Sequence, residues 1–305
     1  MKEIEILMGT YNGSKYLASQ ISSLQNQTYK SWTLLVHDDG STDDTLDVIK
    51  TYSRQDSRIR LIEDGIVFHS PAQNFMHLIK QAEAPYIIFC DQDDIWLENK
   101  LEEMVAFIAL HEENKPCAVY SNSYVYDTYS STISGYATLC HPKELKDILF
   151  ANSGIQGCAL MFNKSLLDIV KSNIPDVVAM HDHVITLAAL TFGNLWYLPK
   201  RLMLYRRHAT AVTGKTSGSK RTLIIPFFQR EKTVLDKRHW DAIKSFYTAY
   251  YGSIPEEKKN IFQDFFKFTG NQNRIGNAIH AYRKGYSLFQ NKGILVAKIL
   301  LRKMI

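Results

Sequence analysis

The sequence predicts an α/β protein with a mainly parallel sheet and helices on both of its faces. In the first part of the chain, short apolar segments typical of strands alternate with longer segments whose apolar residues recur at helical spacing. This alternation is typical of a parallel sheet covered by helices. Two of the strands end in acidic turns, at residues 38–43 and 91–94. Open sheets of this class bind ligands at that carboxyl edge.

The predicted elements follow in a regular order. We expect strands at residues 4–8, 33–36, 59–62, 86–90 and 118–121. Helices are expected between them at 16–25, 43–52, 74–81 and 98–110. The last helix is strongly indicated because one face carries Leu101, Met104, Val105 and Ile108. Beyond residue 121 the pattern is less regular, with helices expected at 145–150 and 182–192 and extended segments at 157–163, 195–197 and 202–205.

Length and composition indicate a soluble protein with a sizeable core. The chain has 305 residues, enough for one large or two modest domains, and is 45% hydrophobic and 22% charged. Its four cysteines lack C-x-x-C spacing, which favours buried free thiols over disulfides or zinc. We see no signal peptide, and no apolar stretch approaches the roughly 20 residues that span a bilayer. We therefore expect a cytoplasmic protein, free or peripheral on the cytosolic face of the membrane.

The net charge of +5 conceals an asymmetry. Residues 215–305 carry 18 Lys and Arg against 6 Asp and Glu, whereas the first 214 residues carry 18 against 25. We predict an acidic body at 1–214 and a basic helical extension at 215–305, with a flexible Gly/Ser/Thr-rich loop at 209–220. Apolar runs at 223–228 and 293–303 suit an anionic membrane surface or another subunit, as in a homo-oligomer. The alternative is a helical subdomain packed on the body with solvated lysines.

The two acidic turns are candidate ligand sites. Asp91 and Asp93 lie two apart in an extended segment, so their side chains share a face and can address one ligand. A cation such as Mn²⁺ or Mg²⁺ held by one or two carboxylates keeps positions free for phosphate oxygens. Asp38 and Asp39 stand where the sheet edge would hold a base or ribose, and helix capping alone does not require both. Together the turns predict a site for a metal-bound nucleotide diphosphate, with Asp39 the better candidate for the base.

Three further segments complete the candidate site. The loop at residues 9–14 is small and polar, and it lacks both G-x-G-x-x-G and G-K-[ST], which argues against dehydrogenases and ATPases. After a predicted strand, Arg206 or Arg207 suits bidentate contact with phosphate, and His208 could ligate a metal or touch the diphosphate. Asp182 opens a predicted helix, where N-capping and a catalytic role can coexist.

Taken in order, these motifs resemble those of family 2 glycosyltransferases with the GT-A fold, a Rossmann-like sheet with flanking helices. The resemblance covers roughly residues 3–208 and rests on the segments Thr10-Tyr11-Asn12-Gly13, Asp38-Asp39-Gly40-Ser41-Thr42-Asp43, Asp91-Gln92-Asp93, Gln156-Gly157-Cys158-Ala159, His181-Asp182-His183 and Tyr205-Arg206-Arg207-His208. It implies transfer of a sugar from a nucleotide diphosphate with inversion at the anomeric carbon. Residues 91–96 are most similar to bacterial rhamnosyltransferases that use dTDP-L-rhamnose. Such an enzyme would act on a lipid-linked oligosaccharide acceptor in cell-surface polysaccharide synthesis.

The resemblance also implies roles for single residues. Asp39 would contact the base, Asp91 the ribose, and Asp93 the metal that bridges the diphosphate, with His208 a further candidate metal ligand. Asp182 matches the family's catalytic base, and His181 stands before it where the family often has Glu. The other expected donor-site residues are Thr10, Tyr11, Asn12, Arg206 and Arg207, with Gln156 and Gly157 lining the acceptor-side floor.

Two other functions fit parts of the sequence. A sugar-phosphate nucleotidyltransferase could also use paired carboxylates and a metal. It would usually have a Gly-rich loop with Lys or Arg after the first strand, and residues 9–14 have neither feature. The basic extension could form a nucleic-acid-binding module, but it is as apolar as it is basic, and the acidic body would repel phosphates. We therefore expect a glycosyltransferase that binds no nucleic acid.

Overall fold

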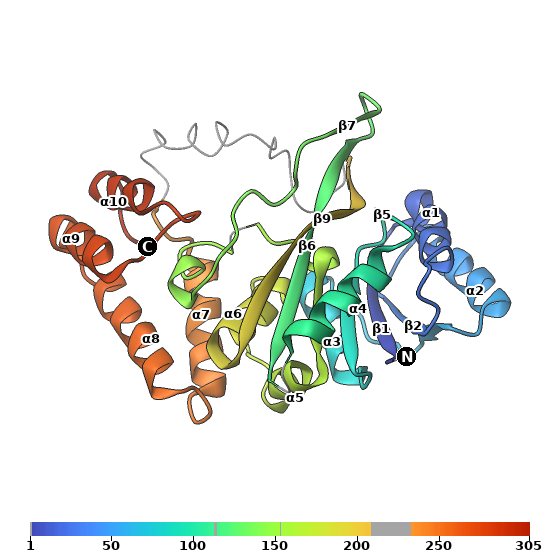
Figure 1. Ribbon diagram of the computed structural model, residues 1–305, viewed down its shortest axis with the longest axis horizontal. Helices are drawn as coiled ribbons and strands as arrows, with labels where there is room; N and C mark the ends of the chain where they lie inside the picture. The colour runs from blue at the N-terminus through green and yellow to red at the C-terminus, as the bar shows by residue number, and fades with distance from the viewer. Residues whose placement is uncertain (1, 113–114, 153, 209–232) are drawn as a thin grey trace.

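The computed structural model describes residues 2–112, 115–152, 154–208 and 233–305, which fold around one mixed sheet (Figure 1). Within these residues the sheet has nine strands in the order β3-β2-β1-β4-β8-β6-β9-β5, and β7 pairs with β6. The strands are β1 (Ile4–Thr10), β2 (Trp32–Asp38), β3 (Ile59–Ile62), β4 (Tyr86–Cys90), β5 (Ile95–Trp96), β6 (Cys117–Asp127), β7 (Thr132–Ser134), β8 (Leu160–Asn163) and β9 (Asn194–Arg207). The α/β fold class predicted from the sequence is confirmed.

The parallel part of the sheet brings the candidate ligand loops together. β1 lies between β2 and β4 and is parallel to both, and β3 pairs in parallel with β2. Thr10 at the end of β1 pairs with Asp38 at the end of β2. β8 then runs antiparallel to both β4 and β6, while β9 is parallel to β6. The loops after β1, β2 and β4 therefore converge at the carboxyl edge where the sequence predicted a ligand.

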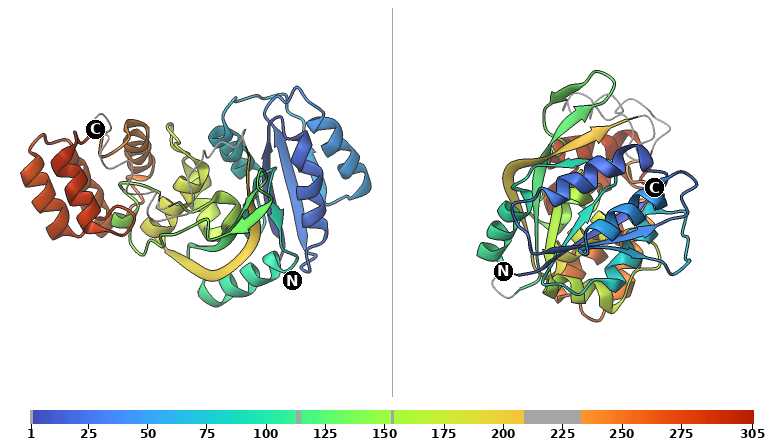
Figure 2. Two further views of the ribbon diagram at one scale, coloured as in Figure 1. Left: turned by 90° about the horizontal axis from the view of Figure 1, so that it is seen from above. Right: turned by 90° about the vertical axis from the view of Figure 1, so that its right-hand side faces the viewer.

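Helices cover both faces of the sheet because side chains alternate along each strand. On one face Ile4, Ile6 and Met8 of β1 share a core with the first, second and fourth helices, and on the other face Leu7 shares a core with the third, fifth and sixth. The helices are α1 (Ser14–Gln25), α2 (Thr45–Gln55), α3 (Pro71–Gln81), α4 (Lys100–His111), α5 (Lys164–Ser172), α6 (His181–Phe192), α7 (Lys237–Tyr250), α8 (Glu256–Thr269), α9 (Arg274–Lys284) and α10 (Lys292–Leu301). The last four helices lie at the opposite end of the molecule from α1 and α2 (Figure 2).

The later elements differ in detail from the prediction. The two strands expected at 195–197 and 202–205 form one long strand, β9, which curves across the molecule (Figure 2). Proline lacks a backbone N–H for the ladder, and the β6–β9 register shifts between Tyr120 and Asn122, just where Pro199 passes. The helix expected at 145–150 is a 3₁₀ turn at Leu145–Asp147, and the extended segment at 157–163 begins with another at Gly157–Ala159.

The C-terminal helices pack directly on the body. Phe265 of α8 meets Phe150 edge-on, with ring centroids 5.4 Å apart, and Tyr250 of α7 donates its hydroxyl to the Val170 carbonyl at 3.0 Å. These residues belong to one continuous core cluster that also includes Leu7 of β1. A division into two units at residue 214 stays a prediction, and the expected loop at 209–220 and apolar run at 223–228 lie outside the described residues. Of the helices that are described, none has the length and apolarity to cross a membrane.

Candidate active site

The candidate site lies where three loops meet at the carboxyl edge of the sheet. Thr10 donates its hydroxyl to Oδ2 of Asp38 at 2.7 Å, which joins the loop after β1 to the turn after β2. Asn12 has a φ of 46°, and its Oδ1 accepts the backbone N–H of Thr42 at 2.8 Å. Asparagine tolerates this left-handed conformation better than most residues do. Side chains from the first two loops therefore hold each other in place.

Tyr11 joins the first loop to the third. Its backbone N–H donates to Oε1 of Gln92, and its carbonyl accepts from Nε2 of the same side chain, both at 2.9 Å. The Tyr11 side chain is 51% exposed, so an aromatic surface borders the sheet edge. The three expected donor-site residues Thr10, Tyr11 and Asn12 thus lie against both acidic turns.

Asp39 is buried, and its carboxylate is engaged by the protein itself. Oδ1 accepts the backbone N–H groups of Phe68 and His69 at 2.5 and 3.0 Å, and Oδ2 accepts that of Ser70 at 2.8 Å. A carboxylate offers about four lone-pair positions, so one position remains for a ligand. Asp39 therefore holds the segment at 68–70 in place, a role that the sequence analysis did not anticipate.

The two expected metal ligands lie in contact with each other. Nε2 of His208 is 2.7 Å from Oδ2 of Asp93, and the two side chains are 9% and 21% exposed. Arg206 fixes the same loop from the end of β9, because its Nε donates to the Asp93 carbonyl at 2.6 Å and its backbone N–H donates to Oδ1 of Asp94 at 2.9 Å. Arg206 thus positions the acidic loop, and a phosphate contact by this residue stays a prediction.

A group of three ionisable side chains accompanies Asp93, and two of them, Asp94 and Cys158, are buried. Candidate ligand atoms of Asp91, Asp94 and Cys158 all lie within 4.8 Å of one another. Burial, assisted by Asp93, raises the pKa of Asp91 to about 6, while burial and the neighbouring carboxylates raise the pKa of Asp94 well above its ordinary value. Burial also raises the pKa of the Cys158 thiol. Side chains whose charged form is disfavoured by burial are poorer ligands for a hard cation, so Asp93 and His208 suit such an ion better than Asp94 and Cys158.

Asp182 lies in the first turn of α6 and is also buried. Its Oδ1 accepts a hydrogen bond from Nδ2 of Asn152 at 3.1 Å. Burial raises the pKa of Asp182 to about 7; a backbone hydrogen bond from His183 opposes this shift, and the Asp91 carboxylate adds to it. A carboxylate that titrates near neutral pH is suited to accept a proton in a reaction. The structure therefore places the candidate base within the electrostatic influence of the acidic loop.

The start of α6 packs tightly on Gly157. A Cβ at this position would lie 2.4 Å from Nε2 of His181. The His181 ring stacks on Phe75 with centroids 3.9 Å apart and meets Phe89 edge-on at 4.5 Å. Burial lowers the pKa of His181 to about 3, so the ring is neutral. His181 is therefore a core aromatic, and Gly157 provides the space for it.

The two remaining predicted residues lie on neighbouring segments. Oε1 of Gln156 accepts the Thr138 hydroxyl at 3.0 Å, which fixes the amide just before the turn at Gly157–Ala159. Arg207 ends β9, where it pairs with Asp127 of β6. Their predicted contacts with donor or acceptor stay predictions.

One important residue could not be identified from the sequence. Lys100 is fully buried, donates to the Cys158 carbonyl at 2.6 Å and lies over the Trp96 ring at 3.5 Å. Burial lowers the pKa of Lys100 to about 8, against the opposing effect of nearby acidic groups. In the sequence it is one of several lysines at the start of a helix. By contrast, the sequence showed Asp94 as part of the acidic turn at residues 91–94, but it gave no sign that this side chain is buried.

Comparison with known proteins relates this site to a family. The family model described as glycosyl transferase family 2 matches residues 5–169. A dTDP-rhamnosyl transferase, RfbG of Shigella flexneri, is 27% identical over 68% of this chain and 73% of its own length. A UDP-Glc:alpha-D-GlcNAc-diphosphoundecaprenol beta-1,3-glucosyltransferase, WfgD of Escherichia coli, is 30% identical over 54% of this chain and 62% of its own.

Solved structures show the same fold at low sequence identity. Residues 1–349 of S. aureus TarS, in complex with UDP, superpose with a TM-score of 0.57 at 15% identity, covering 98% of this chain and 89% of that TarS fragment. Mannosyltransferase PcManGT from Pyrobaculum calidifontis, in complex with GDP-Man and Mn²⁺, gives a TM-score of 0.53 at 14% identity, covering 97% and 86%. The GT-A fold expected from the sequence is confirmed. Because the family model spans more than half of the 305 residues, this chain belongs to glycosyl transferase family 2.

Proposed function

We propose that this protein is an inverting, metal-dependent glycosyltransferase that transfers L-rhamnose from dTDP-L-rhamnose to a lipid-linked glycan in bacterial cell-surface polysaccharide synthesis. The proposal depends above all on the environment of Asp182. Its carboxylate is buried, and its pKa is raised to about 7, mainly by burial and further by the charge of Asp91. This arrangement supplies a proton acceptor beside a site able to hold a nucleotide diphosphate.

The reaction would be a single displacement. The acceptor hydroxyl oxygen attacks the anomeric carbon and forms the new glycosidic bond, while its proton passes to the Asp182 carboxylate. The bond from the anomeric carbon to the diphosphate oxygen breaks on the opposite side, and the electron pair leaves with the diphosphate. The hydrogen bond from Asn152 orients the Asp182 carboxylate, so this base is held in place before the glycan substrate binds.

The metal site of this proposal consists of Asp93 and His208. Their facing Oδ2 and Nε2 atoms supply one carboxylate oxygen and one imidazole nitrogen, a donor set that suits Mn²⁺ and, through the carboxylate, Mg²⁺. A bound divalent ion would offset negative charge on the departing diphosphate. Arg206 contributes by holding the Asp93 backbone, so the carboxylate keeps its direction toward the sheet edge.

Similar proteins support the choice of donor. The S. flexneri relative is named a dTDP-rhamnosyl transferase, whereas the two structural neighbours hold UDP and GDP-Man. All three names refer to nucleotide diphosphates or to sugars carried on them. The dTDP-rhamnose assignment depends on the relative at 27% identity together with the sequence of residues 91–96.

Exposed apolar residues support a membrane-associated acceptor. On α9, Ile275, Ile279 and Tyr282 are 67%, 50% and 62% exposed and recur at the spacing of one helix face. Exposed Arg283 and Lys284 end the same helix. An apolar face flanked by cations suits the surface of an anionic membrane. A lipid-linked acceptor also agrees with the E. coli relative, whose name specifies a diphosphoundecaprenol substrate.

Calorimetric titration with dTDP, UDP and GDP, each with Mn²⁺ or with EDTA, tests the proposal directly. We expect dTDP to bind most tightly and only with the metal. Asp93→Ala should abolish the metal-dependent part of the binding, whereas Asp168→Asn, which changes an exposed acid on α5, should leave it unchanged. A preference for UDP would change the sugar and keep the reaction class. Binding of no nucleotide under any condition would overturn the proposal.

A further inference from the structure

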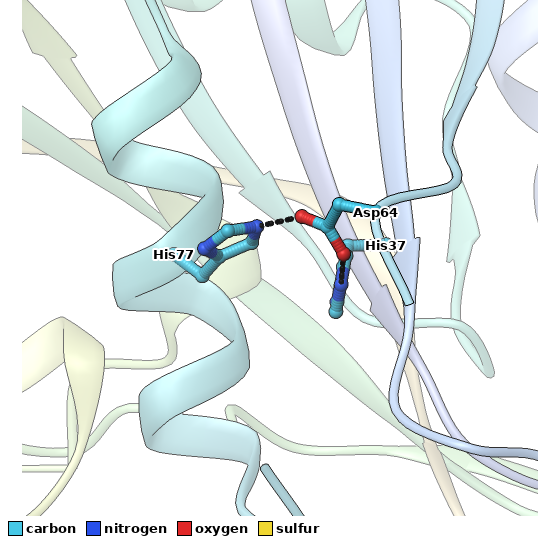
Figure 3. Close-up of side chains that lie close together, drawn as sticks. All are labelled: His37, Asp64 and His77. Atoms are coloured by element: carbon cyan, nitrogen blue, oxygen red, sulfur yellow. Dashed lines mark hydrogen bonds and ion pairs between the residues drawn. The ribbon is translucent and has the colours of Figure 1, made fainter. Parts of the chain in front are cut away.

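A second group of potential metal ligands lies outside the proposed transfer site. His37 is in the penultimate position of β2, Asp64 follows β3, and His77 lies on α3 (Figure 3). Nε2 of His37 is 3.2 Å from Oδ1 of Asp64, and Nε2 of His77 is 2.6 Å from Oδ2 of the same carboxylate. One donor atom from each of the three residues lies within 4.8 Å of the other two. Three separate elements thus direct two imidazoles and one carboxylate to a single point.

The His37 ring is held so that Nε2 faces this point. Asn74 donates its Nδ2 to the His37 carbonyl at 3.2 Å, which leaves its Oδ1 directed at Nδ1 of the His37 ring, 2.6 Å away. Nδ1 therefore carries a proton, and Nε2 is directed at the Asp64 carboxylate. At 3.2 Å, a lone pair on Nε2 and one on the carboxylate would repel each other, and either a proton or a metal cation between them would relieve this repulsion. Metal-binding histidines are commonly oriented by a partner of this kind on the other ring nitrogen.

We propose that His37, Asp64 and His77 bind a divalent transition-metal cation of the Zn²⁺ class. Two histidines and one carboxylate form a common three-residue ligand set for zinc, with a fourth position open to water. Ligand atoms about 2 Å from a tetrahedral ion lie about 3.3 Å from each other, close to the 3.2 Å between His37 and Asp64. Hydrogen bonds could join both imidazoles to the carboxylate only if each Nε2 carried a proton, whereas one metal ion would bind all three ligands.

The surroundings also suit a bound ion. The Phe68 ring lies 5.9 Å from the His37 ring and 5.3 Å from the His77 ring, so it shields the cluster from one side. His37 is buried, and the His77 side chain is 11% exposed. Asp64, at 28%, is the most open of the three and offers a path for the ion to enter.

A metal ion bound by His37, Asp64 and His77 would also stabilise the neighbouring segment that contacts Asp39. Asp64 begins the segment that continues through Phe68, His69 and Ser70, whose three backbone N–H groups bind the Asp39 carboxylate. A metal bound to β2, to the start of this segment and to α3 would hold the segment against the sheet. It would therefore keep Asp39 in position at the predicted base site without taking part in sugar transfer.

Zn²⁺ titration of the nucleotide-free protein in an Asp93→Ala background tests the inference. That background removes a ligand of the proposed donor-site metal, so the result does not depend on the proposed function. We expect one Zn²⁺ per chain by calorimetry, and His77→Gln or Asp64→Asn should weaken it by at least about tenfold. Two variants are used so that the test survives if one of them fails to fold.

His280→Gln provides the matched control. Nε2 of His280 is 2.9 Å from Oδ1 of Asp264 on the C-terminal helices, where the second partner of the carboxylate is the Tyr286 hydroxyl and not another histidine, so this variant removes a similar histidine–carboxylate contact elsewhere. It should leave Zn²⁺ binding unchanged. Substitution of Co²⁺ for Zn²⁺ should give visible ligand-field absorption that weakens in His77→Gln and not in His280→Gln. Absence of binding in the Asp93→Ala protein, or equal binding by His77→Gln and Asp64→Asn, would identify the cluster as a hydrogen-bonded triad and overturn the inference.

Discussion

At the scale of single residues, the environment that would suit Asp182 to act as the proposed base also makes its charged form less stable in the folded protein. Its ordinary pKa of 3.8 rises to about 7 in the folded protein, mainly because of burial. Between these two values the folded state holds a proton that the unfolded state has released. The free energy of unfolding therefore falls as pH rises through this window, because the charged carboxylate is less stable in the folded protein.

Asp182→Asn should consequently lose activity and gain stability. Removal of the general base should lower the transfer rate by about 10²–10⁴-fold. At pH 8 the variant should be more stable than the wild type by up to about 4 kcal/mol, and this gain should disappear near pH 4. Activity assays from pH 5 to 9 and urea unfolding at both pH values measure the two effects. Asp168→Asn is the control. Near-normal turnover by Asp182→Asn would exclude Asp182 as the base.

Gly157 is a position where a single added methyl group would disturb the packing. We expect Gly157→Ala to destabilise the protein by about 1–3 kcal/mol, because the new methyl group would lie 2.4 Å from Nε2 of the buried His181. Urea unfolding measures the cost, and Gly252→Ala, where nothing lies within 4 Å, is the control. If the clash is the cause, the effects of Gly157→Ala and His181→Ala will not be additive. Additive effects would show that the two positions are independent.

At the scale of elements, the loops after the strands support one another. The loop after β1 is bonded to the turn after β2 and to the acidic loop after β4, and the end of β9 fixes the acidic loop from the other side. Asp39 extends this network to the segment before α3 through three backbone hydrogen bonds. The carboxyl edge of the sheet therefore carries a set of loops that support one another through a few carboxylate and amide side chains.

Asp39→Asn tests this bracing. An amide has one acceptor oxygen, and its NH₂ group would face a backbone donor, so we expect a loss of about 1–3 kcal/mol in stability. Amide hydrogen exchange at Phe68, His69 and Ser70 should accelerate more than exchange in α3. Asp44→Asn is a suitable control because Asp44 is exposed and its side chain makes no capping bond to α2. Unchanged exchange at the three amides would contradict the structural role of Asp39.

At the scale of the whole molecule, the C-terminal helices complete the core and carry a separate exposed face. Phe265, Tyr250 and Tyr286 are buried in the cluster that also holds the α6 side of the sheet. Helix α9, which carries this exposed face, lies at the end of the molecule away from β1 and β2 (Figure 1). A face so placed could contact a membrane while α1 and α2 remain at the far end of the molecule.

Substitution of Ile275, Ile279 and Tyr282 by serine should weaken binding to vesicles that contain phosphatidylglycerol. Each exposed apolar side chain contributes about 1 kcal/mol or more when it enters the lipid interface, so the triple variant should lose at least tenfold in affinity. Cosedimentation measures the loss, and the melting temperature should not change. Leu110→Ser, at a residue of α4 that is 78% exposed, controls for a general loss of apolar surface. Equal vesicle binding by the triple variant and the wild type would exclude α9 as the contact.

Local patterns in the sequence were sufficient for the first half of the fold. Alternation of short apolar runs with helical stripes predicted the strands and helices up to β6, because each pattern depends on neighbours within a few residues. The missed elements are short or late, such as β5 (Ile95–Trp96) and α5 (Lys164–Ser172). The motifs of the candidate site could be located because Asp39, Asp93 and Asp182 lie in recognisable local settings at the ends of strands or the start of a helix.

What the sequence by itself determined is therefore the fold class, the order of most elements up to β6 and the chemical types gathered at the sheet edge. The tertiary structure alone decided how those groups behave. Asp93 meets a histidine 115 positions away, Asp39 is held by backbone groups about 30 positions away, and Lys100 is buried behind the acidic loop. Burial and charge–charge distance set the pKa of Asp182. Both are properties of long-range packing, which a local sequence pattern does not contain.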